Sequence, residues 1–391
     1  MDIKNRYFDY AATTPQHPEV TKAMAPYLEE KFGNPSSIHS FGQETKSAIT
    51  AARDKIAAAL KAKSEEIIFT SGGTEADNFA LIGVMEAMAK KGNHIITSAI
   101  EHHAVLETCK YLEKHRGLKV TYMPVDKAGL VDPQEIKKAI TKETVLISVM
   151  HANNEIGTIE PIAEIGKIAK EAGVYFHSDA VQTFGSLDID VNALNVDFLS
   201  ASAHKLYGPK GIGLLYVRKG VRIMPYLHGG EQERRLRAST ENVPGIVGFG
   251  KAVELAEKER TERNRHLVIM RDKLIKGVLE KMDDTQLNGH PQLRLPNNAN
   301  LSVKYIEGES MLLNLDLEGI AASTGSACSS GSLESSHVIK AIGVDPELAH
   351  SSLRFSLGRL NTDEDIDFLL EVLPRIVKKL RAMSPLYKKN K

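Results

Sequence analysis

The sequence predicts an α/β protein with a mostly parallel central sheet flanked by helices, together with a smaller α+β domain. From residue 66 to residue 217, short apolar runs alternate with helical patterns, which is typical of a parallel sheet covered on both faces. After Pro244-Gly245 this alternation stops and a long helical pattern begins. A length of 391 residues suits two or three domains of ordinary size.

The predicted strands are short, continuously apolar segments separated by turn-forming residues. Asp132 and Pro133 supply the cap and the first position of one predicted helix, and Gly173 ends another. In chain order, the predicted strands are 66–70, 94–99, 119–125, 145–150, 174–177, 198–201 and 213–217. Helices are predicted over 74–89, 104–115, the stretch from 133, and 161–172.

The C-terminal part has a different organisation. Residues 246–282 predict one long helix or two abutting helices, because no proline interrupts their helical spacing. Strand-like segments follow at 297–305 and 353–357, with a helical pattern at 310–317 between them. Thr362 caps a final helix that ends in basic residues, as the helix dipole favours. We therefore expect a large domain over 15–255 and a small domain formed by 1–14 and 256–391.

Composition and charge exclude several classes of protein. Fifty Lys and Arg balance fifty Asp and Glu, and a net charge of zero argues against a protein that coats nucleic acid. Cys109 and Cys328 are too few for a disulfide framework or a thiolate metal site, so no intrinsic metal is expected. No apolar run could cross a bilayer and no signal core is visible, so we expect a cytoplasmic protein without membrane contact.

Lys205 lies between the predicted strand 198–201 and the tight turn 207–211. Ligands of open α/β sheets bind beyond the carboxyl ends of the strands, where a lysine can form a Schiff base with an aldehyde cofactor. A lysine near a strand end is more often simply solvated. The hypothesis therefore depends on other residues that suit such a cofactor.

Other predicted strands end in residues that suit pyridoxal phosphate. Asp179 could face the ring nitrogen, and the Ser71-Gly72-Gly73-Thr74 turn could offer amide donors to the phosphate. His102 could stack on the ring, and Asn154 follows the strand at 145–150. Taken singly, Asp179 is better explained as a helix cap, glycine-rich turns are common, and a lone histidine is usually structural. Their meeting at one sheet edge favours a cofactor site.

Motifs along nearly the whole chain give a more specific indication. They are YFDYAATTP (7–15), GNPS (33–36), FTSGGTEADN (69–78), EH (101–102), HANNEIG (151–157), HSDAVQ (177–182), SAHKLYGPKGIG (202–213), HGG (228–230), RAST (237–240), TGSACS (324–329) and LRFSLGR (353–359). With these motifs the chain resembles the pyridoxal-phosphate cysteine desulfurases of the NifS/IscS-like group, within the class V aminotransferases of fold type I.

The resemblance implies roles around the cofactor ring. Lys205 would hold the cofactor covalently and then move protons. Asp179 would pair with the ring nitrogen and Gln182 with the ring hydroxyl. His102 would stack on the ring and act as acid or base.

The resemblance also implies residues for the phosphate and the substrate. The phosphate would be bound by Gly73, Thr74, Ser202 and His204, and by Thr240 of the other subunit in a homodimer with shared active sites. Asn154 would face the cofactor or the substrate, L-cysteine. Arg354 would hold the substrate carboxylate, a task for which a planar guanidinium suits better than an ammonium group.

Cys328 distinguishes between possible reactions. Read alone, a cysteine among small residues is usually inert, but the composition of 323–336 suits a mobile loop better than a core. We assign Cys328 as the thiolate nucleophile that attacks the sulfur of the bound cysteine, leaving alanine and a Cys328 persulfide. Cys109 lies inside the predicted helix 104–115, and we expect it either in the core or on the surface of that helix.

Three functions are compared. The first is a cysteine desulfurase, the second is a different class V enzyme such as a selenocysteine lyase or an aminotransferase, and the third is a non-catalytic scaffold. Cys328 argues against an aminotransferase, and Lys205, Asp179 and His102 argue against a scaffold. The expected acceptor of sulfur is a protein such as an iron–sulfur scaffold or a tRNA thiolation enzyme. Cys328 could then contact an iron–sulfur cluster transiently.

Overall fold

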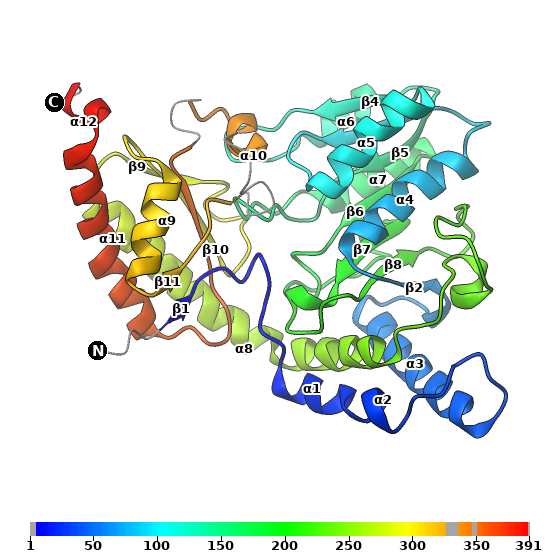
Figure 1. Cartoon of the computed structure of the whole chain (residues 1–391). Helices are drawn as coiled ribbons and strands as arrows, with labels where there is room; N and C mark the ends of the chain where they lie inside the picture. The colour runs from blue at the N-terminus through cyan, green and yellow to red at the C-terminus, as the bar shows by residue number, and fades with distance from the viewer. Residues whose placement is uncertain (1–4, 326–334, 346–349, 390–391) are drawn as a thin grey trace.

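A seven-stranded sheet forms the centre of the larger part of the molecule (Figure 1). The computed structural model describes residues 5–325, 335–345 and 350–389. In the order β2-β8-β7-β6-β5-β3-β4, only β8 runs antiparallel to its neighbours, which confirms the mostly parallel sheet. The strands are β2 Ile67–Thr70, β3 His94–Ser98, β4 Lys119–Met123, β5 Thr144–Ser148, β6 Tyr175–Asp179, β7 Phe198–Ser202 and β8 Gly213–Val217.

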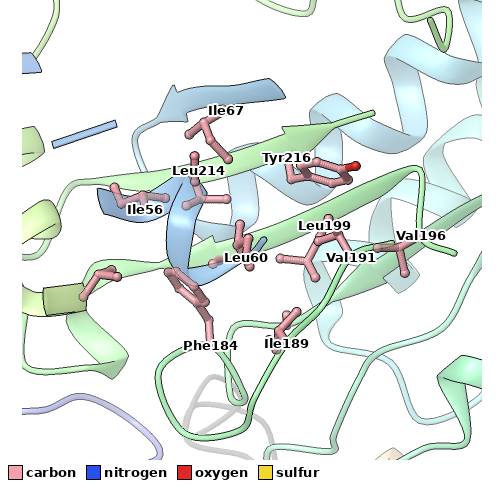
Figure 2. Close-up of a cluster of buried hydrophobic side chains, with 14 of the residues drawn as sticks. Ile56, Leu60, Ile67, Phe184, Ile189, Val191, Val196, Leu199, Leu214 and Tyr216 are labelled. Atoms are coloured by element: carbon pink, nitrogen blue, oxygen red, sulfur yellow. The ribbon is translucent and has the colours of Figure 1, made fainter. Parts of the chain in front are cut away.

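Helices cover both faces of this sheet. On one face, α4 (Gly73–Ala87) and α5 (His103–Arg116) bury apolar side chains such as Phe79 and Val105 against Ile95. The opposite face is covered by α3 (Ser40–Ala59), α6 (Pro133–Ala139), α7 (Ile162–Ala172) and the first half of α8. In Figure 2, Ile56 of α3 and Leu60, the residue that caps this helix, lie beside Leu214 of β8, in the core on that second face.

Capping residues set the ends of the helices that lead into the site. His102 precedes α5, and its Nδ1 accepts a hydrogen bond from the backbone N–H of Ala104 at 3.1 Å. Gly117 and Gly173 end α5 and α7 with φ near 65°, a left-handed conformation that costs glycine little. Helices α4 and α5 begin just after the carboxyl ends of β2 and β3, at the edge of the sheet where ligands of such folds bind.

A smaller body has its own sheet and its own core. The antiparallel strands β9 (Thr285–Asn288), β10 (Asn298–Val303) and β12 (Ser352–Ser356) form the sheet. The packed helices are α9 (Gly308–Leu317) and α11 (Asp363–Met383). The N-terminal strand β1 (Arg6–Tyr7) joins this body by pairing with β11 (Ile320–Ala321), although the two are far apart in sequence.

Helix α8 (Val243–Lys281) connects the two bodies as one uninterrupted helix of 39 residues. Phe249 packs in the core of the larger body, whereas Met270 and Leu274 pack in the core of the smaller one. Figure 1 shows α8 passing from one body to the other. The predicted domain boundary at residue 255 falls inside this helix, and the proposed division stays a prediction.

The remaining helices are α1 (Pro18–Met24), α2 (Pro26–Glu29), α10 (His337–Ala341) and α12 (Pro385–Lys389). Thr362 begins α11 as predicted: its side chain accepts from the backbone N–H of Asp365, and the Asp365 carboxylate accepts from the backbone N–H of Thr362. Within the residues that the structure describes, no helix is both long enough and apolar enough to span a membrane.

Candidate active site

A cavity of about 310 Å³ opens at the carboxyl ends of the parallel strands. Its walls come from the start of α4, the residues after β3 and β5, the ends of β6 and β7, and β12 of the smaller body. The predicted site residues that line it are Gly73, Thr74, His102, Asn154, Asp179, Gln182, Ser202, His204, Lys205 and Arg354. Residues predicted from separate strand ends are thus brought together in one cavity.

Among the described residues, one predicted site residue, Thr240, is not in this wall. Thr240 lines a different hollow, together with Ser71, Gly211 and Arg237. Cys328 lies outside the described residues. The prediction that Thr240 serves the other subunit of a dimer therefore stays a prediction, as does the role of Cys328.

Lys205 lies just after β7, at the C-terminal end of a short 3₁₀ turn (Ala203–Lys205). Its Nζ donates hydrogen bonds to the carbonyl oxygens of Ala11 and Ala12 at 2.6 and 2.8 Å. The backbone N–H of Thr14 donates in turn to the carbonyl of His204 at 3.1 Å. The N-terminal segment is therefore fixed against the lysine, and its carbonyl oxygens direct the ammonium group.

Asp179 is the last residue of β6 and its side chain is buried. The backbone N–H of Val181 donates to its Oδ1 at 2.8 Å. Burial raises the pKa of Asp179, while that hydrogen bond and the charge of Lys205 favour the carboxylate. A positive group placed beside this carboxylate inside the cavity would be strongly stabilised.

His102 presents a neutral imidazole to the cavity. Burial and the charge of Lys205 lower its pKa to about 4. Because Nδ1 accepts from the N–H of Ala104, the proton of the neutral ring resides on Nε2. The helix cap thus fixes both the orientation of the ring and its tautomer.

The start of α4 provides donors for an anion. The first N–H groups of a helix have no partner within the helix and carry positive partial charge. The Ser202 hydroxyl faces this turn, since a Cβ built on Gly72 would lie 4.0 Å from its Oγ. A Cβ on Gly73 would approach Val181 Cγ2 to 2.7 Å, so this position favours glycine. A second hollow at this place is lined by Thr13, Ser71, Gly72, Gly73, Thr74, Glu75, Ser202, His204, Lys210 and Gly211.

Arg354 brings a buried guanidinium to the cavity from β12. Its Nη1 donates to the carbonyls of Asn154 and Gly325 at 3.0 and 3.2 Å, and its Nη2 forms a 2.8 Å ion pair with Asp9. Among the described residues, Arg354 Nε has no hydrogen-bond acceptor. A carboxylate ligand could satisfy this donor.

Sequence reasoning missed several cavity residues. Asp77, Glu101 and Glu155 line the wall and are buried, and burial raises the pKa of each carboxyl, for Glu101 to about 8. His103, to which the sequence assigned no role, also lines the cavity, and its ring centroid lies 4.8 Å from that of His337. Asp77 could have been suggested by its position one helical turn after Thr74 on α4.

Cys109 is enclosed within the core beneath α5. Burial raises the pKa of its thiol, which keeps it protonated and unreactive. This placement settles the open choice between core and helix surface in favour of the core.

Comparisons with known proteins agree with this fold. The sequence model of the family described as aminotransferase class-V matches residues 6–369. The cysteine desulfurase IscS of Dictyoglomus turgidum is 60% identical over 379 residues, covering 97% of this chain and 96% of the relative. The cysteine desulfurase IscS of Methanosarcina thermophila is 61% identical over 384 residues, covering 98% and 95%.

Solved structures give the same result. A NifS-like protein superposes with a TM-score of 0.90 at 40% identity, covering 96% of this chain and all (100%) of that one. The protein SspA, solved in complex with cysteine, gives a TM-score of 0.81 at 38% identity, with coverages of 90% and 98%. These matches confirm the fold and the resemblance read from the motifs. The chain belongs to the aminotransferase class-V family and, within it, to the cysteine desulfurases of the NifS/IscS-like group.

Proposed function

We propose that this enzyme uses pyridoxal 5'-phosphate to convert L-cysteine to L-alanine, with the sulfur passing to Cys328 as a persulfide and then to an acceptor protein. One observation carries the proposal: Lys205, Asp179, His102 and the start of α4 all line a single cavity. The family is one of pyridoxal phosphate enzymes, and its cysteine desulfurase members match this chain at high identity.

The residues of the cavity fit pyridoxal phosphate. An aldehyde requires an amine, which Lys205 supplies, and a protonated ring nitrogen requires a buried carboxylate, which Asp179 supplies. The phosphate requires several N–H and O–H donors, which the start of α4 and Ser202 supply. When bound, this cofactor acts as an electron sink for charge that develops on the substrate carbon.

Arg354 and Asn154 would bind the substrate. The unpartnered Nε of Arg354 supports an interaction with the L-cysteine carboxylate, and its contacts with Asn154 and Asp9 fix its plane. The relative SspA was solved with cysteine, which supports the same substrate here.

Lys205 and His102 would handle protons during the reaction. Lys205 Nζ is directed by two carbonyl oxygens, and the neutral His102 carries its proton on Nε2. The Cys328 thiolate would attack the sulfur of L-cysteine, so that an S–S bond forms and the C–S bond breaks. The carbon then takes up a proton, and cysteine plus thiol become alanine plus persulfide with all atoms accounted for.

The acceptor and the assembly complete the proposal. An iron–sulfur scaffold fits the relatives named IscS, and a tRNA thiolation enzyme is the alternative acceptor. Thr240, which lies away from the cavity of its own chain, would reach the phosphate of the second subunit in a homodimer. A reducing, cytoplasmic compartment suits the cycle, because Cys328 must return to the free thiol.

The test is incubation of the purified holoenzyme with L-cysteine, followed by measurement of alanine and of the mass of the Cys328 peptide. We expect one alanine for each sulfur added to that peptide before an acceptor is present. Alanine without added sulfur on the Cys328 peptide would contradict the proposed sulfur carrier. A colourless protein that cannot be reconstituted with pyridoxal phosphate would contradict the cofactor.

A further inference from the structure

Glu75 lies in the first turn of α4, beside the turn 71–74 that is proposed to bind the cofactor phosphate. Its Oε2 accepts a hydrogen bond from the backbone N–H of Ser71 at 2.8 Å, which ties the turn to the helix. The same side chain lines the hollow that contains Ser202 and His204. A carboxylate suits the dipole at the start of a helix, but here its negative charge lies beside the place proposed for a phosphate.

Arg237 compensates this charge from a distant part of the chain. Its Nε donates to Glu75 Oε1 at 2.8 Å and its Nη2 donates to Glu75 Oε2 at 3.1 Å, so the guanidinium contacts both carboxylate oxygens. The Arg237 and Glu75 side chains are only 18% and 13% exposed, which limits screening by water. Burial would raise the pKa of Glu75, but the hydrogen bonds from Arg237 and Ser71 lower it, so the carboxylate is ionised.

The segment 231–240, which carries Arg237, is anchored beside the same turn. Glu233 accepts two hydrogen bonds from Arg53, both at 2.7 Å, and a third from the backbone N–H of Phe69 in β2 at 2.9 Å. Its φ of 43° is left-handed, as are the values of 58° and 67° at the next two residues. Non-glycine residues keep such a conformation only where their surroundings impose it. The place of Arg237 is therefore fixed by packing.

We propose that Glu75 and Arg237 are positioning residues that act together in cofactor binding: Glu75 shapes the phosphate-binding turn, and Arg237 cancels the charge that would otherwise repel the phosphate. The inference rests on the proposed function, since it takes the anion to be the phosphate of pyridoxal phosphate. Arg237 lines the neighbouring hollow with Ser71 and Thr240, so its effect on this phosphate passes through Glu75.

The test removes the two charges one at a time. Arg237→Gln leaves the carboxylate uncompensated, Glu75→Gln removes the charge but keeps an oxygen for the Ser71 N–H, and the double variant is neutral again. Each apoenzyme is titrated with pyridoxal phosphate, and the dissociation constant is read from the absorption. We expect Arg237→Gln to weaken binding on the order of 10-fold. Glu75→Gln should bind at least as tightly as wild type, and the double variant should return to within about 3-fold of wild type.

Pyridoxal, which lacks the phosphate, separates the charge effect from general damage to the site. Its dissociation constant should be the same in wild type, Arg237→Gln and the double variant. Arg218→Gln is the matched control, because Arg218 also forms an ion pair with a carboxylate, Asp197, at 3.2 Å and is 28% exposed. It should lower the melting temperature and leave the dissociation constants of both compounds unchanged.

Three results would overturn the inference. Equal weakening in both single variants and the double variant would show that the ion pair only anchors the segment 231–240. An equal loss for pyridoxal and pyridoxal phosphate would show that the phosphate is not involved. Unchanged binding of pyridoxal phosphate in Arg237→Gln would contradict the charge compensation directly while leaving the proposed function intact.

Inorganic phosphate tests the anion site without the cofactor. It should raise the melting temperature of the wild-type and double-variant apoenzymes more than that of Arg237→Gln. If this pattern appears while wild type binds no pyridoxal phosphate, the proposed function fails and the inference about the anion site stands. If neither compound binds to wild type, both are overturned.

Discussion

Arg354 and Asp9 lie 345 positions apart in the sequence, yet Arg354 Nη2 and Asp9 Oδ1 are joined by a 2.8 Å ion pair at the active-site cavity. Asp9 belongs to the N-terminal segment whose carbonyl oxygens at Ala11 and Ala12 bind Lys205. One short segment therefore orients both the cation proposed for the substrate carboxylate and the lysine proposed for the cofactor.

Replacing Arg354 by lysine should weaken substrate binding. Lysine keeps the charge but loses the planar fork that contacts Asp9, Asn154 and Gly325 together. We expect KM for L-cysteine to rise on the order of 10- to 100-fold with a smaller change in kcat. Steady-state kinetics check this. Asp9→Asn, which keeps an oxygen acceptor for Nη2, serves as control, and an unchanged KM in Arg354→Lys would contradict the assignment.

Lys205→Ala should abolish the colour of the enzyme and its turnover. Without Nζ, no amine in this position can hold the aldehyde. Absorption spectra after reconstitution with pyridoxal phosphate measure the effect, and circular dichroism verifies the fold. Lys219→Ala removes an exposed lysine paired with Glu65 and should leave the spectrum unchanged. A normal spectrum in Lys205→Ala would show that another residue binds the cofactor.

The two cysteines should behave in opposite ways. Cys328→Ala should keep the cofactor spectrum but stop sulfide release from L-cysteine. Cys109→Ala should keep turnover and lose roughly 1–2 kcal/mol of stability, because it leaves a small cavity in the core. Sulfide assays and thermal melts measure these outcomes. Unchanged turnover in Cys328→Ala would assign sulfur transfer to another group.

The buried carboxyl of Glu101 should make stability fall as pH rises above 6.5. Burial raises its folded-state pKa from 4.5 to about 8, so between these values the folded state binds a proton that the unfolded state releases. Each such proton contributes a slope of up to about 1.4 kcal/mol per pH unit.

The buried histidines have the opposite effect, because they make stability rise with pH, and this effect is largest below pH 6.5. Burial lowers the pKa of His102, His151 and His204 to about 4 and that of His177 to about 3, so their contribution to stability is lost as pH falls below 6.5. Because the unfolded rings titrate near pH 6.5, their opposing effect fades between pH 6.5 and 8, where the folded rings are neutral. Melts of wild type and Glu101→Gln over that range should show a shallower pH dependence in the variant, and identical slopes would contradict a protonated Glu101.

Most of the parallel sheet could be predicted because each buried strand is a short apolar run between helix signals. The antiparallel direction of β8 could not be predicted, because an apolar run in the sequence does not indicate whether its strand is parallel or antiparallel to its neighbours. Lys205, Asp179 and His102 were recognisable because each lies at or just after the end of a strand, and the resemblance carried by the motifs then implied their roles. Glu101 and Glu155 were not assigned roles, because a carboxylate is normally exposed and their burial depends on distant partners.

Helices α1 to α3 were not predicted from local patterns, and their place is set by packing. The buried Val20 of α1 and Ile56 of α3 join the core beneath the sheet, beside the first half of α8. Whether 246–282 forms one helix or two was also undecided, because local propensity does not report the two cores that the helix contacts. Packing against both cores supports the single helix.

The continuity of α8 has a consequence for how the molecule comes apart. Its first half packs in one core with Phe249, and its second half packs in the other with Met270 and Leu274. Unfolding of either core therefore removes the packing that stabilises half of the helix, and this couples the unfolding of the two cores. Heat should therefore unfold the chain in one cooperative calorimetric transition, with equal calorimetric and van't Hoff enthalpies. A pair of glycines placed on the exposed side of the helix between these halves should split that transition into two.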